Sequence, residues 1–289
     1  MKTWNIGSVR ITQIVESGGT PTSSRFLFAN GSSELVKAHP WLLPHFATPE
    51  GKLLMSIHAF VIESQGQRIV VDTCVGNDKK RASEAWNMLN GPFLQDLEQA
   101  GLPADSIDTV LCTHLHVDHV GWNTRLVDGR WVPTFPNARY LFARTEWEHW
   151  SNEPVGPTGD EVISDSVRPI VDAGLADLVE SDHRITDEVW LEPTPGHTPG
   201  HVSVRIASDG HEAVITGDLM HHPIQCSIPD EPVQFDWNGD AARATRRGFL
   251  TRYCDCDVMV LGTHFAAPTA GWFTRDGEAW RFAVEKPET

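Results

Sequence analysis

The sequence lacks the features by which several protein classes are recognised. No window approaches about eighteen uncharged apolar residues, the length that a membrane helix needs, so we expect no membrane association. Residues 1–7 contain no apolar core of a secretion signal, which predicts a cytoplasmic location. The five cysteines are odd in number, Cys254 and Cys256 are too close to pair comfortably, and Cys112 lies in an apolar run. Reduced thiols are therefore expected, without a disulfide framework.

Positive charge is scarce as well. The 23 lysine and arginine residues stand against 39 aspartates and glutamates, which gives a formal net charge of −16. A protein that binds nucleic acid presents a basic face, because neutralising phosphate supplies most of the affinity. The sequence therefore predicts no nucleic-acid partner and disfavours an RNA-processing enzyme. Bound metal cations would offset part of the negative charge locally.

The most informative motif, His-Leu-His-Val-Asp-His, begins at His114, one residue after the apolar run 107–112. Three imidazoles and a carboxylate at the end of a buried strand can converge on metal from one short loop. Because side chains alternate along an extended chain, His114 and His116 point the same way and can bind one ion. Asp118 and His119 follow where the chain turns, placed for a second ion about 3.5–4 Å away. The motif therefore predicts two adjacent half-sites.

Two half-sites need further ligands, and three more strand ends supply them. His197 lies in a Gly- and Pro-rich turn between two strand-like segments. Asp218 follows the apolar run 213–217, and His264 follows the apolar run 258–263 in the same way. One histidine after a strand is more often a surface or core residue than a ligand. Three such endings, each with a residue type that binds metals, favour ligands.

Taken in order, the segments HxHxDH, GHTPGH, TGD and GTH resemble the metallo-β-lactamase superfamily over nearly the whole chain. The resemblance implies two metal ions with a defined ligand set. One ion would be held by His114, His116 and His197, the other by Asp118, His119 and His264, with Asp218 bridging both. Within the superfamily, the chain is most similar to the N-acyl-homoserine lactonases and the organophosphate (methyl parathion) hydrolases.

Two adjacent cations imply the chemistry of a hydrolase. Together they lower the pKa of a bridging water, so that hydroxide forms at neutral pH beside a lactone or ester carbonyl that one metal polarises. Asp118 and Asp218 are the expected catalytic side chains: both can orient the hydroxide, and Asp118 can carry its proton to the leaving alkoxide. Zinc is the first expectation for both ions, although nitrogen and oxygen ligands also admit Mn, Fe or Co. His221 and His222 stay unassigned, as pocket groups or as polar loop residues.

Turn signals and apolar runs predict hairpins and helices along the chain. Strands are expected at 57–63, 68–73, 189–191, 202–208, 212–216, 271–274 and 279–282, with the strongest hairpin across Asp209-Gly210, and helices at 93–100 and 241–253. Strands in two groups with interleaved helices fit two packed sheets. The resemblance implies an αββα sandwich, two mixed β-sheets flanked by helices, in one domain spanning residues 1–289.

The segment 18–52 is rich in Gly, Pro, Ser and aromatic residues, and two interpretations of it stay open. Its aromatics could pack against the core or against a second subunit of a homodimer. Alternatively, they could form an apolar wall over the metal site that receives the hydrophobic arm of a small ester or lactone. In the second case Trp41 and Phe46 would set the preference for long substrate chains.

Other members of the superfamily offer alternative functions. Common zinc β-lactamases carry a cysteine where this chain has Asp218, and Cys226 comes eight positions later, which argues against antibiotic cleavage. Persulfide dioxygenases hold one iron and would leave His119 and His264 unused. A glyoxalase-II-like thioesterase needs basic residues for glutathione. The candidates for that role also fit a solvated helix face: Arg243, Arg246, Arg247 and Arg252.

Phosphotriester hydrolysis and an inert metal-binding module complete the alternatives. The small number of tyrosines argues against the lactonase prediction, because a lactonase of the best-known type places a tyrosine near the substrate carbonyl. Only Tyr140 and Tyr253 are present, and both lie in segments typical of core strand or helix. An inert module would be expected to have lost ligands, and all seven are present here.

Overall fold

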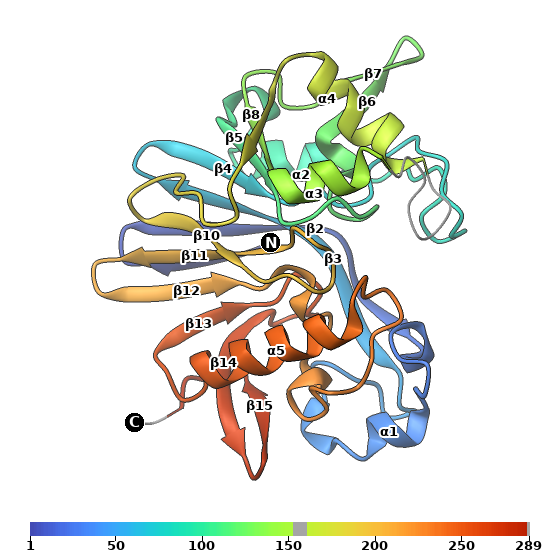
Figure 1. Cartoon of the computed structure of the whole chain (residues 1–289), viewed down its shortest axis with the longest axis vertical. Helices are drawn as coiled ribbons and strands as arrows, with labels where there is room; N and C mark the ends of the chain where they lie inside the picture. The colour runs from blue at the N-terminus through green and yellow to red at the C-terminus, as the bar shows by residue number, and fades with distance from the viewer. Residues whose placement is uncertain (153–160, 288–289) are drawn as a thin grey trace.

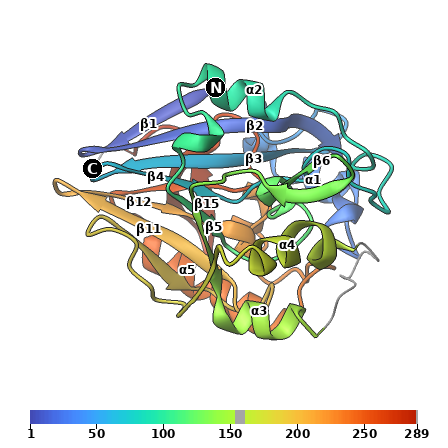
Figure 2. The same cartoon turned by 90° about the horizontal axis from the view of Figure 1, so that it is seen from above.

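The computed structural model describes residues 1–152 and 161–287, and two β-sheets lie back to back at its centre (Figure 1). The first sheet has the strand order β1-β2-β3-β4-β5-β8-β9. Its strands are β1 (Lys2–Ile6), β2 (Val9–Thr22), β3 (Leu53–Ser64), β4 (Gln67–Val71), β5 (Thr109–Cys112), β8 (Arg139–Ala143) and β9 (Ala176–Val179). Strands β1 to β4 pair antiparallel, and β4, β5, β8 and β9 pair parallel, so the sheet is mixed. The long strands β2 and β3 run side by side across the molecule (Figure 2).

The second sheet has the strand order β10-β11-β12-β13-β14-β15. Its strands are β10 (Val189–Pro193), β11 (Val202–Ser208), β12 (His211–Ile215), β13 (Val258–Leu261), β14 (Ala270–Asp276) and β15 (Ala279–Ala283). Only the pair of β12 and β13 is parallel among these neighbours, because α5 connects those two strands. The hairpin expected across Asp209-Gly210 is present, and β14 and β15 form another across Gly277 and Glu278. A separate hairpin joins β6 (Thr124–Val127) to β7 (Arg130–Pro133).

The core between the sheets forms because alternate side chains of each strand point inward. In β3, Phe60 and Ile62 face this inner core, whereas Val61 faces the opposite side of the sheet. In β12, Ile215 faces the inner core and Val214 faces away. Side chains on both faces of these strands are buried, so each sheet needs a cover on its outer face as well.

Helices provide those covers. The helical elements are α1 (Ser33–Lys37), α2 (Phe93–Gln99), α3 (Arg144–Trp150), the π-helical turn at Ile163–Val167, α4 (Arg168–Asp172) and α5 (Gly239–Tyr253). Short 3₁₀ turns lie at Ser24–Phe26, Pro40–Leu42, Ala104–Ser106, Gly121–Asn123, Gly217–Leu219 and Pro223–Cys226. Helices α2, α3 and α4 cover the first sheet, and α5 with α1 lies on the side of the second (Figure 1). The αββα sandwich of two mixed sheets is thus confirmed.

The segment 18–52 differs from a continuous loop. Strand β2 extends to Thr22, and α1 and two 3₁₀ turns follow. Phe28, Leu42 and Phe46 are buried in the cluster beneath the second sheet, so most of the segment packs against the core.

Among residues 1–152 and 161–287, no helix is long and apolar enough to cross a lipid bilayer.

Candidate metal centre

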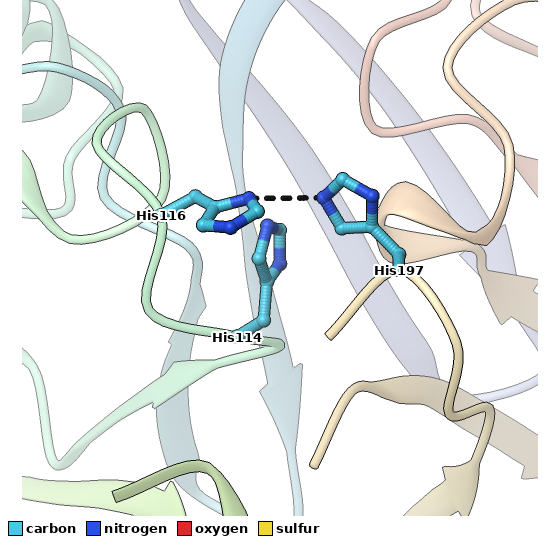
Figure 3. Close-up of side chains that lie close together, drawn as sticks. All are labelled: His114, His116 and His197. Carbon is cyan, nitrogen blue, oxygen red and sulfur yellow. Dashed lines mark hydrogen bonds between the residues drawn. The ribbon is translucent and has the colours of Figure 1, made fainter. Parts of the chain in front are cut away.

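The loop after β5 carries the first group of candidate ligands. A buried carboxylate fixes both ends of this loop: Asp72 accepts hydrogen bonds from the Thr113 backbone N–H (2.8 Å) and from the Thr113 hydroxyl, and it lies 3.0 Å from His119 Nδ1. Between these anchors, His114 and His116 point toward a common centre (Figure 3). The loop geometry therefore follows from one carboxylate at the end of β4.

Loops of the second sheet bring the remaining candidates to the same place. His197 lies between β10 and β11, and its ring faces those of the first loop (Figure 3). Gly217 turns the chain after β12 with a φ of +58°, a conformation that favours glycine, and Asp218 follows it. A Cβ at Gly217 would lie 2.5 Å from His201 Nε2, which accepts the Asp218 backbone N–H at 2.8 Å. His264 follows β13.

The structure brings all seven predicted ligands together, in two groups. His114, His116 and His197 form one group, with ligand atoms within 4.8 Å of one another. Within it, His197 Nε2 lies 3.0 Å from His116 Nδ1 (Figure 3). Asp118, His119 and His264 form the second group within the same limit.

Asp218 lies between the two groups. Its Oδ2 atom is 3.8 Å from His114 Nε2 and 3.6 Å from His197 Nε2 in the first group. The same oxygen is 3.3 Å from His119 Nε2, and Oδ1 is 3.2 Å from His264 Nε2 in the second group. A carboxylate in this position can contact ions in both half-sites.

The hydrogen bonds of the ring Nδ1 atoms show which nitrogens face the centre with a free lone pair. Nδ1 of His264 lies 2.9 Å from the Ser56 carbonyl oxygen, and Nδ1 of His119 faces the Asp72 carboxylate. Both acceptors require an N–H on Nδ1, so Nε2 of each neutral ring is unprotonated. These two Nε2 atoms are nonetheless only 3.3 Å apart.

Two lone pairs at that distance repel each other unless a cation, either a metal ion or a proton on one of the rings, lies between or beside them. His197 repeats the pattern, because its Nδ1 lies 3.0 Å from Asp236 Oδ1 and its Nε2 faces the first group. In addition, His114 Nε2 is buried and has no hydrogen-bond partner among the described residues. The inward-facing nitrogens of these rings therefore form a donor set that suits metal ions.

The pKa values of the histidines are shifted in opposite directions in the two groups. Burial lowers the pKa of His114, His116 and His197 well below the usual range, and neighbouring histidines lower it further. The neutral ring is the form that binds metal. In the second group burial opposes charging of His119, but the carboxylates of Asp218 and Asp72 outweigh it and raise its pKa well above the usual range.

Negative charge exceeds positive charge around both groups. The carboxylates in or directly against the cluster are Glu16, Asp72, Asp118, Glu146, Asp218 and Asp236. The buried Arg246 contributes a positive charge beside one of these carboxylates, with its guanidinium 3.5 Å from Asp236 Oδ2. Two divalent ions would balance this excess.

Arg246 is the exception to the predicted solvated helix face on α5. Its side chain is buried, and it donates to the carbonyl oxygens of Leu219 and Pro229. Arg247 and Arg252 have about half or more of their side-chain surface exposed, at 49% and 61%. The interpretation of a solvated helix face therefore does not hold for Arg246, which contacts the loop that carries Asp236.

Three histidines of the second sheet have different roles. His221 lines the cavity above the cluster, and its Nε2 lies 3.2 Å from Asp218 Oδ2. His222 faces away, where Nε2 donates to the Phe46 carbonyl oxygen at 2.8 Å and Nδ1 accepts the Ile224 backbone N–H. His201 positions Asp218, as described above. The position of His221 three residues after Asp218 indicates that it could face the pocket. Its contact with Asp218 in the folded chain assigns it to the cavity wall.

A cavity of about 830 Å³ opens above the cluster, and most of its wall is apolar. The wall includes Phe26, Met55, Ile57, Trp86, Val162 and Phe235, and the floor includes His116, Asp118, His197, Asp218, His221 and His264. The described residues that line the cavity include no lysine or arginine. Residues 153–160 and 288–289 contain neither residue type.

The predicted role of Trp41 and Phe46 as pocket wall is wrong. Phe46 is buried against Phe265 and Phe282 on the far side of the second sheet, and Trp41 packs against the same cluster. From the segment 18–52, only Thr20, Thr22 and Phe26 reach the cavity among the described residues. The apolar wall comes mainly from the chain between β4 and α2 and from the region of the π-helical turn.

Neither tyrosine lines the cavity. The Tyr140 hydroxyl accepts the Phe135 backbone N–H and donates to the Asn123 carbonyl oxygen inside the first sheet's cover. The Tyr253 hydroxyl lies against Glu192 and Arg205 at the outer face of the second sheet. Of the described residues outside the seven candidate ligands, His221 faces the cavity beside Asp218.

Comparison with known proteins gives one family and several relatives. A family model described as the metallo-beta-lactamase superfamily matches residues 54–272. An N-acyl homoserine lactonase of Bacillus thuringiensis is 25% identical over 185 residues, which cover 58% of this chain. That match spans 66% of the relative, so the chain covers just under two thirds of its length.

Solved structures show the same fold at low sequence identity. AidC, described as a dizinc quorum-quenching lactonase, is 18% identical with a TM-score of 0.79, covering 100% of this chain and 98% of its own. AbOPH, described as a hydrolase in the beta lactamase superfamily, is 22% identical with a TM-score of 0.78, covering 99% and 98%.

Proposed function

Because the chain belongs to the metallo-beta-lactamase superfamily, we propose that it is a binuclear metal-dependent hydrolase of neutral lactones or esters with an apolar arm. The observation that carries this proposal is the position of the seven candidate ligands at the floor of an apolar cavity. Residues 1–289 act as one unit in this proposal, because both sheets contribute ligands to the centre.

The proposed ligands follow the two groups. His114, His116 and His197 would hold one ion, and Asp118, His119 and His264 would hold the other, with Asp218 between them. Zinc is proposed for both sites, and Mn, Fe or Co suits the same nitrogen and oxygen donors. When bound, the ions lower the pKa of a coordinated water and polarise an ester carbonyl.

Two carboxylates would orient the attacking water and transfer its proton. Asp118 lines the cavity and has Oδ2 3.5 Å from His264 Nε2, so one face of its carboxylate points to the substrate side. It can accept a proton from the attacking water and deliver it to the leaving oxygen. Asp218 is more deeply buried and would orient the water from below.

The absence of lysine and arginine from the described cavity lining indicates which charge the substrate carries. An anionic substrate such as a glutathione thioester needs a positive group to hold its carboxylates. The exposed arginines of α5 lie outside the cavity, and Arg246 is enclosed beneath Asp236. The cavity therefore favours an uncharged substrate whose arm is held by apolar contact.

Phosphotriester hydrolysis is the second candidate, and two observations favour it. Phosphotriesters are uncharged, so the same lining suits them. The cavity also lacks a tyrosine among the described residues, and His221 stands beside Asp218 instead. A lactone or ester remains our first choice because the cavity, at about 830 Å³, has room for an apolar acyl arm.

The test is a substrate panel with the purified, zinc-loaded protein. We expect turnover of homoserine lactones and neutral aryl esters, with specificity that rises with the length of the apolar arm. We expect kcat/KM for a glutathione thioester to be lower by about 10²-fold or more, because its carboxylates find no cation. Preference for the thioester would refute the substrate class, and preference for paraoxon-like triesters would select the second candidate.

Trp86→Ala should reduce the preference for long arms. Trp86 lines the cavity, and each buried methylene of the substrate contributes up to about 0.8 kcal/mol. We expect KM for ten-carbon arms to rise about tenfold, and KM for two-carbon arms to change by less than about twofold. The matched control is Trp41→Ala, which removes the same side chain from the cluster outside the cavity and should leave the dependence on arm length unchanged. Equal effects of the two variants would contradict this assignment.

A further inference from the structure

A buried carboxylate joins the two loops that carry the three-histidine group. Glu146, in the first turn of α3, has 1% of its surface exposed. Its Oε1 accepts the Leu115 backbone N–H at 3.1 Å and the Trp150 indole N–H at 2.6 Å. Its Oε2 accepts the Gly200 backbone N–H at 2.9 Å.

These contacts place Glu146 between the candidate ligands. Leu115 separates His114 from His116, and Gly200 lies three residues after His197. The two loops belong to different sheets, and the facing atoms His197 Nε2 and His116 Nδ1 are 3.0 Å apart. One carboxylate thus accepts hydrogen bonds from the backbone of both loops.

The approach of α3 to the second loop requires a glycine. A Cβ at Gly200 would lie 2.4 Å from the Glu146 backbone nitrogen and 2.8 Å from its Cα atom. Any larger residue must move the loop away from α3. The second glycine of the Gly-His-Thr-Pro-Gly-His segment therefore serves the contact with Glu146.

The three contacts favour a carboxyl group over an amide, and burial raises the pKa of Glu146. All three partners are N–H donors, and a carboxylate offers acceptors on both oxygens. A glutamine would present an NH₂ group to at least one of these donors, and a buried donor that faces another donor costs about 1–3 kcal/mol. The contacts are therefore specific for a carboxyl group rather than for the shape of the side chain.

We propose that Glu146 is a positioning residue that sets the separation of His116 and His197, and so determines the affinity of the three-histidine half-site for its metal ion. The proposal rests on the metal centre of the proposed function. Glu146 itself contacts neither substrate nor metal in this assignment. Its effect passes through the backbone of two loops.

The test is zinc binding by the full-length Glu146→Gln variant, measured by competition with a chromophoric chelator. Loss of a group that supports metal ligands typically weakens binding by about 10–100-fold, and we expect a decrease in that range for one of two ions. Anomalous diffraction at the zinc edge then identifies the depleted site, which should be that of His114, His116 and His197. The matched control is Glu188→Gln, because Glu188 accepts the hydroxyls of Ser8, Ser64 and Ser208 outside the cavity. It should bind both ions as the wild type does.

Gly200→Ala provides a second variant in which Glu146 is intact. It should weaken the same half-site, because the added Cβ separates the loop from α3. Unchanged affinity in both variants, or equal loss at the two half-sites, would overturn the proposal. If the wild-type protein itself binds no zinc, the proposed function fails instead, so the two failures are distinguishable. Should Glu146→Gln not fold, Gly200→Ala decides.

Discussion

Asp218→Ala is expected to remove metal from both half-sites and to abolish turnover. Asp218 is the candidate ligand that lies within 3.8 Å of His114, His119, His197 and His264. Without it, the first group keeps three imidazoles, the second keeps two imidazoles and the Asp118 carboxylate, and both lose the shared negative charge. Metal ions contribute several kcal/mol to transition-state stabilisation, so we expect kcat/KM to fall by about 10³-fold or more.

Elemental analysis and activity should be measured together on this variant. Asp218→Asn is the companion variant, since it keeps the size of the side chain and removes its charge. Asp209→Ala, at an exposed hairpin turn, controls for the loss of a carboxylate as such and should bind metal normally. Two ions per chain in Asp218→Ala would refute its position between both sites.

Chelation of the metals is expected to reduce hydrolysis to the uncatalysed rate, whereas Ser56→Ala is expected to keep most of the activity. Ser56 is the side chain that most resembles an alternative nucleophile, because it lines the cavity and its hydroxyl lies 2.8 Å from His58 Nδ1. However, its hydroxyl also contacts the Ser17 carbonyl oxygen at 3.1 Å, and burial lowers the pKa of His58 to about 3. A ring with that pKa is a weak general base.

The support for His264 comes from the Ser56 backbone carbonyl, which the alanine variant retains. Activity should therefore be compared in four samples: wild type and Ser56→Ala, each before and after chelation and gel filtration. Loss of activity in Ser56→Ala together with survival of activity after chelation would replace the metal mechanism with a serine nucleophile.

The candidate ligands could be predicted from the sequence because each depends on local information. An apolar run followed by glycine and then Asp218, or by Gly-Thr-His264, shows where a strand ends and which side chain follows. Strands that end at one edge of a sheet sandwich place those side chains together. The same logic applies to Asp72, which follows β4, although its motif contains no second ligand.

The supporting residues could not be predicted in this way. Glu146 contacts Leu115 and Gly200 from a helix, and Asp236 contacts His197 across 39 positions of sequence. Neither lies at a strand end or in a recognisable spacing. Their role exists only in the folded chain.

The residues that form the wall of the cavity could not be predicted from the sequence either. Aromatic side chains in the segment 18–52 can bury equally well against a pocket or against the core, so composition does not separate Phe26 from Phe46. Phe46 enters the cluster with Phe265 and Phe282, whereas Phe26 packs beside Phe235 at the cavity, with ring centroids 5.0 Å apart. Arg246 is similar, because helical periodicity alone does not reveal the buried Asp236 beside it.

The most direct test of the binuclear centre is reconstitution of the metal-free protein with zinc. Activity should be followed against the number of zinc equivalents added, with bound zinc measured in the same samples. The account predicts that bound zinc saturates at two ions per chain and that full turnover requires both. Full activity at a single ion per chain, or activity that is independent of zinc, would contradict it.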